Sequence, residues 1–250
     1  MNDFIQGFFY PVRCIKLFFI HPKLILYSIV PMLINLIIYG TILFYVYNWL
    51  MGKSADMMDQ MDTGSILFEL IQPLIKIFSF IIVLVVCYFA FVIFGGIIAA
   101  PFNEKISKYI EEKLFNKKIE NSLSTIKDAM VSIKEELKKL AFYFSIMIPL
   151  ILIDFIPMIG SVITLVFGSL FSFFYNALDY LDYPLTRRIT KFRNKLKTVG
   201  SKRNLSLGFG CIAFILTLLP LINVLLNPIL VVSGTRLFYE RGYDKILMSE

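Results

Sequence analysis

A few ionisable side chains lie inside or at the ends of long apolar stretches, where charge needs a physical reason. The bases are Lys23, Arg187, Arg188 and Arg236, and the acids are Asp154, Asp179 and Asp182. A base at the mouth of an apolar segment can hold an anion, and an acid inside such a segment can carry a proton. Each residue also has a structural interpretation, as a surface anchor, a cap or a member of an ion pair.

The sequence offers little for enzymatic chemistry. His21 is the only histidine, so neither a histidine zinc site nor a relay of histidines can be built. We find no Walker A loop, dinucleotide fingerprint or nucleophile elbow. Cys14, Cys87 and Cys211 are widely separated in or beside apolar segments, which predicts buried free thiols. We therefore predict no enzymatic activity, no cofactor and no bound metal.

The composition requires lipid around the chain. Apolar residues fill 58% of the 250 positions and charged residues 17%, whereas a globular domain has about 45–50% and about 25%. Residues 24–52 and 77–103 carry no charge, and about 20 apolar residues span a bilayer. The net charge of +7 is spread over loops, which is typical of cytoplasmic loops rather than of a nucleic-acid interface. We predict an all-α integral membrane protein that contacts lipid and binds no nucleic acid.

The first half of the chain predicts two long transmembrane helices. An amphipathic segment over 1–23 precedes spans at 24–50 and 73–100. The loop after the first span carries one lysine and three aspartates between positions 51 and 65. Because cytoplasmic loops are rich in bases, this loop is expected outside and the N-terminus inside the cell.

The segment 101–140 is of a different kind. Its apolar residues recur at helical spacing with lysines and glutamates opposite, which predicts cytoplasmic amphipathic helices. We expect Pro101 to end the second span, with Asn103 and Glu104 capping the following helix and fixing the bend.

Two apolar stretches, 141–178 and 205–237, are each broken by a proline, Pro157 and Pro220 respectively. Their first limbs have only 16 and 15 residues, against the roughly 17–25 that a full span needs. We predict two half-penetrating helical hairpins, an arrangement that in transporters marks the transport site. The alternative is two pairs of short spanning helices with prolines at their ends. Asn223, at the second break, is expected to satisfy freed backbone groups.

Residues 184–204 connect the two hairpins. They carry eight bases and no acid, and four apolar residues recur along one helical face. This pattern predicts a single basic amphipathic helix on the cytoplasmic side. Both hairpins therefore open towards the cytoplasm, and the C-terminus also lies inside.

Five stretches, in this order, resemble CysZ and its relatives, the etoposide-induced protein family of membrane proteins. They are Pro22 with 31–35 (PMLIN), 97–104 (IIAAPFNE), 179–184 (DYLDYP) with Arg187, 208–210 (GFG), and 220–223 (PLIN) with Pro228 and 234–235 (GT). The resemblance covers nearly the whole chain. It implies two long transmembrane helices with two half-penetrating hairpins, homo-oligomers, and sulfate uptake across the bacterial inner membrane for cysteine synthesis.

A sulfate path would need cations and backbone N–H groups in place of water. The candidates are Lys23, Arg187, Arg188, Asn223 and Arg236. We expect Asp179 or Asp182 to pair with the two adjacent arginines. Asp154 is either a proton-coupling group or a structural partner.

One departure from the family pattern concerns the first motif. Sulfate-transporting members carry Gly-Leu-Arg just after the first proline, and this chain reads Pro22-Lys23-Leu24-Ile25. A lysine offers a point charge without the two-pronged guanidinium fork. The alternative function is therefore a non-transporting protein that shapes the bilayer or scaffolds partners through its amphipathic helices.

Overall fold

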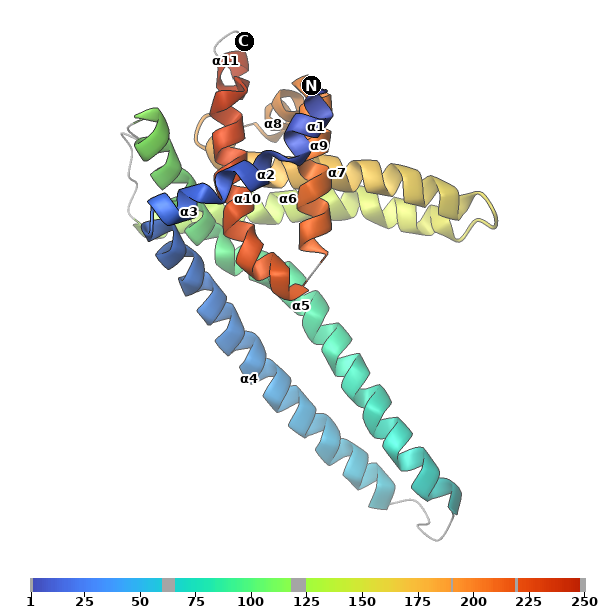
Figure 1. The fold of residues 1–250 in the computed structure, drawn as a ribbon. Helices are drawn as coiled ribbons and strands as arrows, with labels where there is room; N and C mark the ends of the chain where they lie inside the picture. The colour runs from blue at the N-terminus through green and yellow to red at the C-terminus, as the bar shows by residue number, and fades with distance from the viewer. Residues whose placement is uncertain (1, 60–65, 118–124, 190, 219, 248–250) are drawn as a thin grey trace. The chain divides into compact units, whose positions relative to one another are not determined.

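The computed structural model describes residues 2–59, 66–117, 125–189, 191–218 and 220–247, and all regular structure in these ranges is α-helical (Figure 1). The helices are α1 (Asp3–Phe8), α2 (Tyr10–Cys14), α3 (Lys16–Ile20), α4 (Lys23–Asp59), α5 (Ile66–Phe115), α6 (Thr125–Asp154), α7 (Gly160–Thr186), α8 (Phe192–Ser201), α9 (Arg203–Thr217), α10 (Pro220–Glu240) and α11 (Tyr243–Leu247). The predicted all-α class is confirmed.

The chain divides into two compact units. One comprises Met1–Ile29 with Ala100–Glu250, and the other comprises Val30–Ala99. In the described part of the chain, two segments are long and apolar enough to cross a membrane, Lys23–Leu50 and Gly160–Thr186. The first agrees with the predicted span at 24–50. Within the predicted span at 73–100 the chain is helical throughout, and Ile77–Cys87 forms an apolar stretch.

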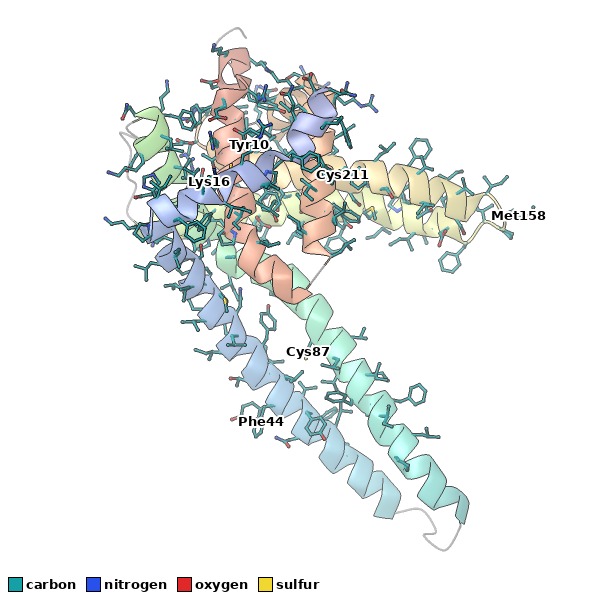
Figure 2. The ribbon with its side chains drawn as sticks, in the orientation of Figure 1. Tyr10, Lys16, Phe44, Cys87, Met158 and Cys211 are labelled. Carbon is teal, nitrogen blue, oxygen red and sulfur yellow. The ribbon has the colours of Figure 1, made fainter. Side chains whose placement is uncertain are left out.

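The smaller unit exposes most of its apolar side chains. Phe44, Tyr45 and Trp49 on α4 are each more than 60% exposed, and Figure 2 shows Phe44 pointing away from the ribbon. Inside the unit, the rings of Tyr47 and Phe80 meet edge to face with centroids 6.0 Å apart. Such apolar surface is costly in water and is accommodated by lipid.

The predicted helix end at Pro101 is wrong, because α5 continues through this residue to Phe115. A proline inside a helix removes one backbone hydrogen bond but does not force the helix to stop. Asn103 and Glu104 consequently lie inside a helix rather than at its N-terminus, and their side chains contact other helices instead of capping.

The predicted division of the chain at residue 140 does not coincide with a helix boundary. The amphipathic part before this residue and the apolar part after it form one continuous helix, α6. The character of the exposed surface changes along α6 while its backbone hydrogen bonding does not. An apolar limb of the predicted first hairpin is therefore the second half of a longer helix.

Residues 184–204 do not form one helix. Pro184 lies in the last turn of α7, and the next helix, α8, begins only at Phe192 after Lys191 adopts an extended backbone. Arg188 Nη1 donates to the carbonyl of Pro184 at 2.7 Å and so satisfies a group that the helix end leaves free. This contact draws the start of the basic segment back onto α7.

The predicted hairpin turn at Pro157 lies between α6 and α7, two helices that pack side by side in Figure 1. The turn covers 155–159, and Met158 at its tip has a φ of 66° and is 93% exposed (Figure 2). Thr164 Oγ1 donates to the carbonyl of Leu150 at 2.9 Å and ties the two limbs together. The second predicted hairpin corresponds to α9 and α10, which also contact each other.

Helix α7 is the centre of the larger unit and packs against α6, α8, α9 and α10, while α1 packs on α9. Two glycines of α9 permit these close approaches. A Cβ on Gly208 would overlap the carbonyl of Phe4 in α1, and a Cβ on Gly210 would overlap the carbonyl of Phe173 in α7. The backbones therefore touch directly at these points.

The three cysteines are free, as predicted. Cys14 is buried, whereas Cys87 and Cys211 are only half-buried. The expectation that all three are buried therefore holds for Cys14 alone.

Candidate functional site

The end of α7 leads into a group of polar side chains that we call the arginine cluster: Glu104, Ser107, Glu111, Arg187 and Arg188. The first three lie on one face of α5 at i, i+3 and i+7, the spacing that aligns side chains along a helix. Arg187 donates to Glu104 through Nη1, and through Nη2 to Ser107 Oγ at 2.8 Å and Glu111 Oε1 at 2.5 Å. One guanidinium thus joins the end of α7 to two turns of α5.

Arg188 occupies the rim of the arginine cluster. Its Nη2 lies 3.2 Å from Glu111 Oε2 and also donates to the hydroxyl of Tyr239. Its guanidinium lies over the rings of Phe238 and Tyr239, 5.5 and 5.2 Å from their centroids. The side chain is 27% exposed, against 12% for Arg187. Arg188 is therefore held firmly while part of its charge faces outwards.

The arginine cluster balances two guanidinium groups against two carboxylates. Burial lowers the pKa of Arg187, but the carboxylates of Glu104 and Glu111 outweigh burial, so the pKa is raised. Thr235 Oγ1 donates to Ser107 Oγ at 2.8 Å and adds α10 to the network. The arginine cluster therefore joins α5, α7 and α10 with charge that is matched inside it.

A second group, the lysine cluster, consists of Glu135, Glu136, Lys139, Asp179, Asp182 and Lys195. Lys139 Nζ lies 2.8 Å from Glu136 Oε2 and also pairs with Asp179. Lys195 Nζ lies 2.7 Å from Glu135 Oε2 and 2.8 Å from Asp182 Oδ1. Each lysine is only 1% exposed. The two ammonium groups hold α6 and α8 against the last turns of α7.

The lysine cluster contains more acids than lysines, and this excess of carboxylates shifts the pKa of Glu136 and of Lys139. Burial raises the pKa of Glu136, and the nearby Asp179 carboxylate raises it further against the opposing effect of Lys139. Burial lowers the pKa of Lys139, but the carboxylates of Asp179 and Glu136 outweigh burial and leave the pKa well above its ordinary value. Lys139 therefore stays charged, while burial favours the protonated form of Glu136.

Tyr183 connects the two clusters. Asn103 Nδ2, on the helix that carries Glu104, donates to the Tyr183 hydroxyl at 3.0 Å. On the other side, Lys139 Nζ lies 5.2 Å from the centroid of the Tyr183 ring. Tyr183 therefore contacts both α5, the helix of the arginine cluster, and Lys139 of the lysine cluster.

The two predicted aspartates pair with lysines rather than with the adjacent arginines. Asp179 pairs with Lys139 and Asp182 with Lys195, so the expected pairing with Arg187 and Arg188 is wrong. The helix geometry explains the difference. Asp179 and Asp182 point from α7 towards α6 and α8, whereas Arg187 and Arg188 follow the helix end and turn towards α5.

Two predicted bases lie outside both clusters. Lys23 is the first residue of α4, is exposed, and makes no hydrogen bond or ion pair with a residue in the described ranges. Arg236 Nε donates to Glu240 Oε1 at 2.6 Å, one turn further along α10, and Glu240 also accepts from Tyr10 at 2.5 Å. Lys23 is thus an uncompensated surface charge, and Arg236 belongs to a local ion pair.

The remaining predicted residues lie at the hairpin turns. Asp154 ends α6, is exposed, and has no hydrogen-bond or ion-pair partner among the residues that the structure describes. Pro157 lies in the exposed turn between α6 and α7, and Pro220 is the first residue of α10. The side chain of Asn223, in the first turn of α10, lies outside what the structure describes.

Five charged members of the two clusters escaped prediction, the buried Glu111, Glu136, Lys139 and Lys195 and the half-buried Glu135. Apolar spacing predicts amphipathic helices for their segments without showing what the charged face contacts. A signal was available for Glu111, which follows Glu104 and Ser107 at i+7 and i+4 and so shares one face with them. For the lysines, no sequence pattern distinguishes a charge facing water from a charge facing another helix.

The contacts in the two clusters are electrostatic, and a site of this kind can bind an anion without forming a covalent bond. Arg188 is fixed by a carboxylate, a hydroxyl and two aromatic rings, so its guanidinium is preorganised rather than free to rotate. Among the described residues, no group of three or more His, Cys, Asp and Glu is arranged to hold a metal ion.

Known proteins resemble this chain over nearly its whole length. A family model described as Sulfate transporter CysZ/Etoposide-induced protein 2.4 matches residues 10–228. A protein named Sulfate transporter CysZ from Pectobacterium atrosepticum is 30% identical over 240 residues, covering 95% of this chain and 84% of the relative. Another of that name, from Vibrio atlanticus, is 26% identical over 250 residues, covering 98% and 96%.

Proposed function

This chain belongs to the family described as Sulfate transporter CysZ/Etoposide-induced protein 2.4, and we propose that it carries sulfate, or a similar small oxyanion, across the bacterial inner membrane. The named relatives support this proposal, because their similarity extends over nearly the whole chain. Sulfate taken up in this way would supply sulfur assimilation.

The observation that carries the proposal is the preorganised Arg188 at the rim of a charge-matched network. Transport of a dianion requires donors that replace its water without binding it too tightly. Among the described residues, Glu111 supplies the one carboxylate on Arg188, and Arg187 shares it; the Arg188 side chain stays 27% exposed. A partly neutralised, partly exposed guanidinium provides such a donor. Arg187 is enclosed by its partners, so we assign it the task of positioning Glu111 and the end of α7.

Lys23 supplies the second cation of the proposed path. Its ammonium is exposed and unpaired among the described residues, so it attracts anions from solution without first breaking an ion pair. Asn223 and Arg236 remain proposed path residues at the second hairpin. The Glu240 partner of Arg236 reduces its attraction for anions.

We further propose that α6 with α7 and α9 with α10 enter the bilayer as re-entrant hairpins in a homo-oligomer, with both chain termini in the cytoplasm. The apolar turn between α6 and α7 supports membrane entry, since Phe155 is 81% and Met158 93% exposed. Because α7 is long enough to cross, labelling a cysteine at position 158 from each side of the membrane separates the two arrangements. Labelling only from the periplasmic side would contradict the re-entrant one.

The proposal is tested by radiolabelled sulfate uptake into liposomes that contain the purified protein. We expect uptake above that of empty liposomes, competed by thiosulfate. Arg188→Ala should lower the uptake rate about ten- to a hundredfold, because it removes a charge-assisted donor worth about 1.5–3 kcal/mol. Lys23→Ala should lower it about three- to tenfold.

Matched controls remove charge elsewhere in the same unit. Arg193 on α8 and Lys16 on α3 are exposed and have no partner among the residues in the structure's described ranges. Arg193→Ala and Lys16→Ala should leave uptake unchanged. Equal losses in the controls would show that only overall charge matters and would remove Arg188 and Lys23 from the path.

One observation favours the alternative function, a protein that shapes the membrane or scaffolds partners. The segment around α3 exposes Phe19 at 83% and Ile20 at 66%, which suits shallow insertion into one leaflet. Absence of sulfate uptake by folded, inserted protein, together with vesicle deformation that depends on these two residues, would favour this alternative over transport.

A further inference from the structure

A cavity of about 450 Å³ lies where the ends of four helices converge in the larger unit. Its polar lining comes from Asp3 on α1, Ser201 at the end of α8, Lys202, Arg203 and Asn204 at the start of α9, and Arg241 after α10. None of these residues belongs to the arginine or lysine cluster. Three bases and one acid therefore face a common space that the proposed transport function does not use.

The bases around this cavity are not neutralised as those of the two clusters are. The guanidinium groups of Arg203 and Arg241 form no hydrogen bond or ion pair with any residue that the structure describes. Lys202 is held in place, since its ammonium donates to the carbonyl of Arg241 and lies 5.6 Å from the centroid of the Tyr243 ring. The cavity thus combines one fixed cation with two cations that lack partners.

The surface beside the cavity is apolar. Phe4 and Ile5 follow Asp3 directly on α1 and are 36% and 44% exposed, and Phe9 at the end of α1 is 53% exposed. A charged cavity bordered by exposed apolar side chains matches a ligand with a charged head and an apolar tail. A small soluble anion has no apolar part that could contact this border.

The volume of the cavity also favours a ligand larger than a small anion. The cavity corresponds to about fifteen times the ≈30 Å³ share of one water molecule, far more room than one tetrahedral oxyanion needs. The space is sufficient for a phosphate with an attached glycerol. No side chain caps the start of α9, so its first N–H groups add further donors for phosphate oxygens.

We propose that this cavity binds the phosphate-bearing headgroup of an anionic phospholipid. Arg203 and Arg241 contact the phosphate, Lys202 supports them, and the acyl chains extend along Phe4, Ile5 and Phe9. The bound lipid would join α1 to the ends of α9 and α10. This inference does not depend on the identity of the transported anion.

The test uses native mass spectrometry of the purified full-length protein in detergent micelles. Dioleoyl phosphatidylglycerol is the probe, and dioleoyl phosphatidylcholine is the lipid control. We expect preferential retention of phosphatidylglycerol, and at least fivefold weaker retention in the double variant Arg203→Gln, Arg241→Gln. The matched control Arg193→Gln removes an exposed arginine outside the cavity and should retain the lipid as the unmodified protein does.

A second variant guards against loss of binding through misfolding. Asp3→Asn removes the one carboxylate among the described residues that line the cavity and should strengthen phosphatidylglycerol binding about two- to fivefold, because a charge of the same sign as the phosphate is removed. A gain of this kind cannot result from a damaged fold. Unchanged or weaker binding in Asp3→Asn would count against the proposal.

Competition with inorganic phosphate distinguishes a lipid headgroup from a free phosphate ion, since both present the same phosphate oxygens. If millimolar phosphate displaced phosphatidylglycerol and stabilised the protein as much as the lipid does, the ligand would be a free oxyanion and the lipid assignment would be wrong. Equal retention of both lipids, or no difference between the double variant and Arg193→Gln, would overturn the proposal entirely.

Discussion

The arginine cluster and the lysine cluster both surround the end of α7, yet they neutralise charge in different ways. In the first, Arg187 and Arg188 share Glu111, and the numbers of guanidinium and carboxylate groups match. In the second, Lys139 and Lys195 each face two carboxylates. Both link neighbouring helices to α7, but only the second leaves an excess of acid. Burial raises the pKa of one acid in each cluster, Glu104 in the first and Glu136 in the second, so we expect both clusters to respond to pH.

The largest effect is expected for Lys139→Met. It leaves Glu136 and Asp179 without their shared cation in a buried position, and breaking such a pair typically costs about 3–5 kcal/mol. The free energy of unfolding can be followed by circular dichroism during SDS titration in mixed micelles. Adding Asp179→Asn should recover part of the loss. A loss below about 1 kcal/mol would mean that the carboxylates find water or take up protons without cost.

The arginine cluster is disrupted most directly by removing the charge of Glu111, the carboxylate that both arginines share. Glu111→Gln removes the charge that serves both Arg187 and Arg188, and we expect a loss of about 2–4 kcal/mol in the same unfolding measurement. Glu104→Gln is the matched comparison, because Glu104 bridges to Arg187 but not to Arg188. Its effect should be smaller. Equal effects of the two substitutions would contradict the central role of Glu111.

The link between the clusters runs through Tyr183, which makes one hydrogen bond with Asn103 and one cation–π contact with Lys139. Tyr183→Phe keeps the ring beside Lys139 but leaves the buried Asn103 amide without its acceptor, at a cost of about 1–3 kcal/mol. Asn103→Leu in the Tyr183→Phe background tests the origin of the loss. Since both polar partners are then absent, the double variant should be less than additively destabilised; strict additivity would refute the link.

The smallest effect concerns pH. The pKa of Glu136 is raised above its ordinary 4.5 in the folded protein, first by burial. From 4.5 up to that raised pKa, the folded state binds more protons, so stability falls as pH rises and the contribution is lost above the raised pKa. Unfolding midpoints at about pH 5 and about pH 8 should therefore differ less in Glu136→Gln than in the unmodified protein. Glu104→Gln provides the corresponding measurement for the arginine cluster.

Much of the architecture was predictable from local patterns. The apolar runs without charge predicted membrane helices, and Pro157 marked the turn between α6 and α7 correctly. Helix ends were predicted less well. Pro101 lies inside α5, because a helix tolerates the loss of one hydrogen bond when tertiary packing favours its continuation.

The site was only partly predictable, because local sequence patterns do not show how the helices pack against one another. Arg187, Arg188, Asp179 and Asp182 were identified from their position beside apolar segments, and all four lie in the two clusters. Lys139 and Lys195 were not identified, because an amphipathic pattern shows that a face is polar without showing what covers it. Burial of that face depends on the approach of α7, which no local spacing encodes.

The glycine contact between α1 and α9 has a consequence for biosynthesis. Gly208, against which Phe4 packs, leaves the ribosome about 200 residues after that residue does. At roughly 5–20 residues per second this delay is about 10–40 seconds. The first helix must therefore remain undocked, with its apolar side chains sheltered by the membrane surface, until nearly all of the chain has been made. Completion of the larger unit is thus a late event, and truncation before α9 would leave the earliest segment of the protein without its partner.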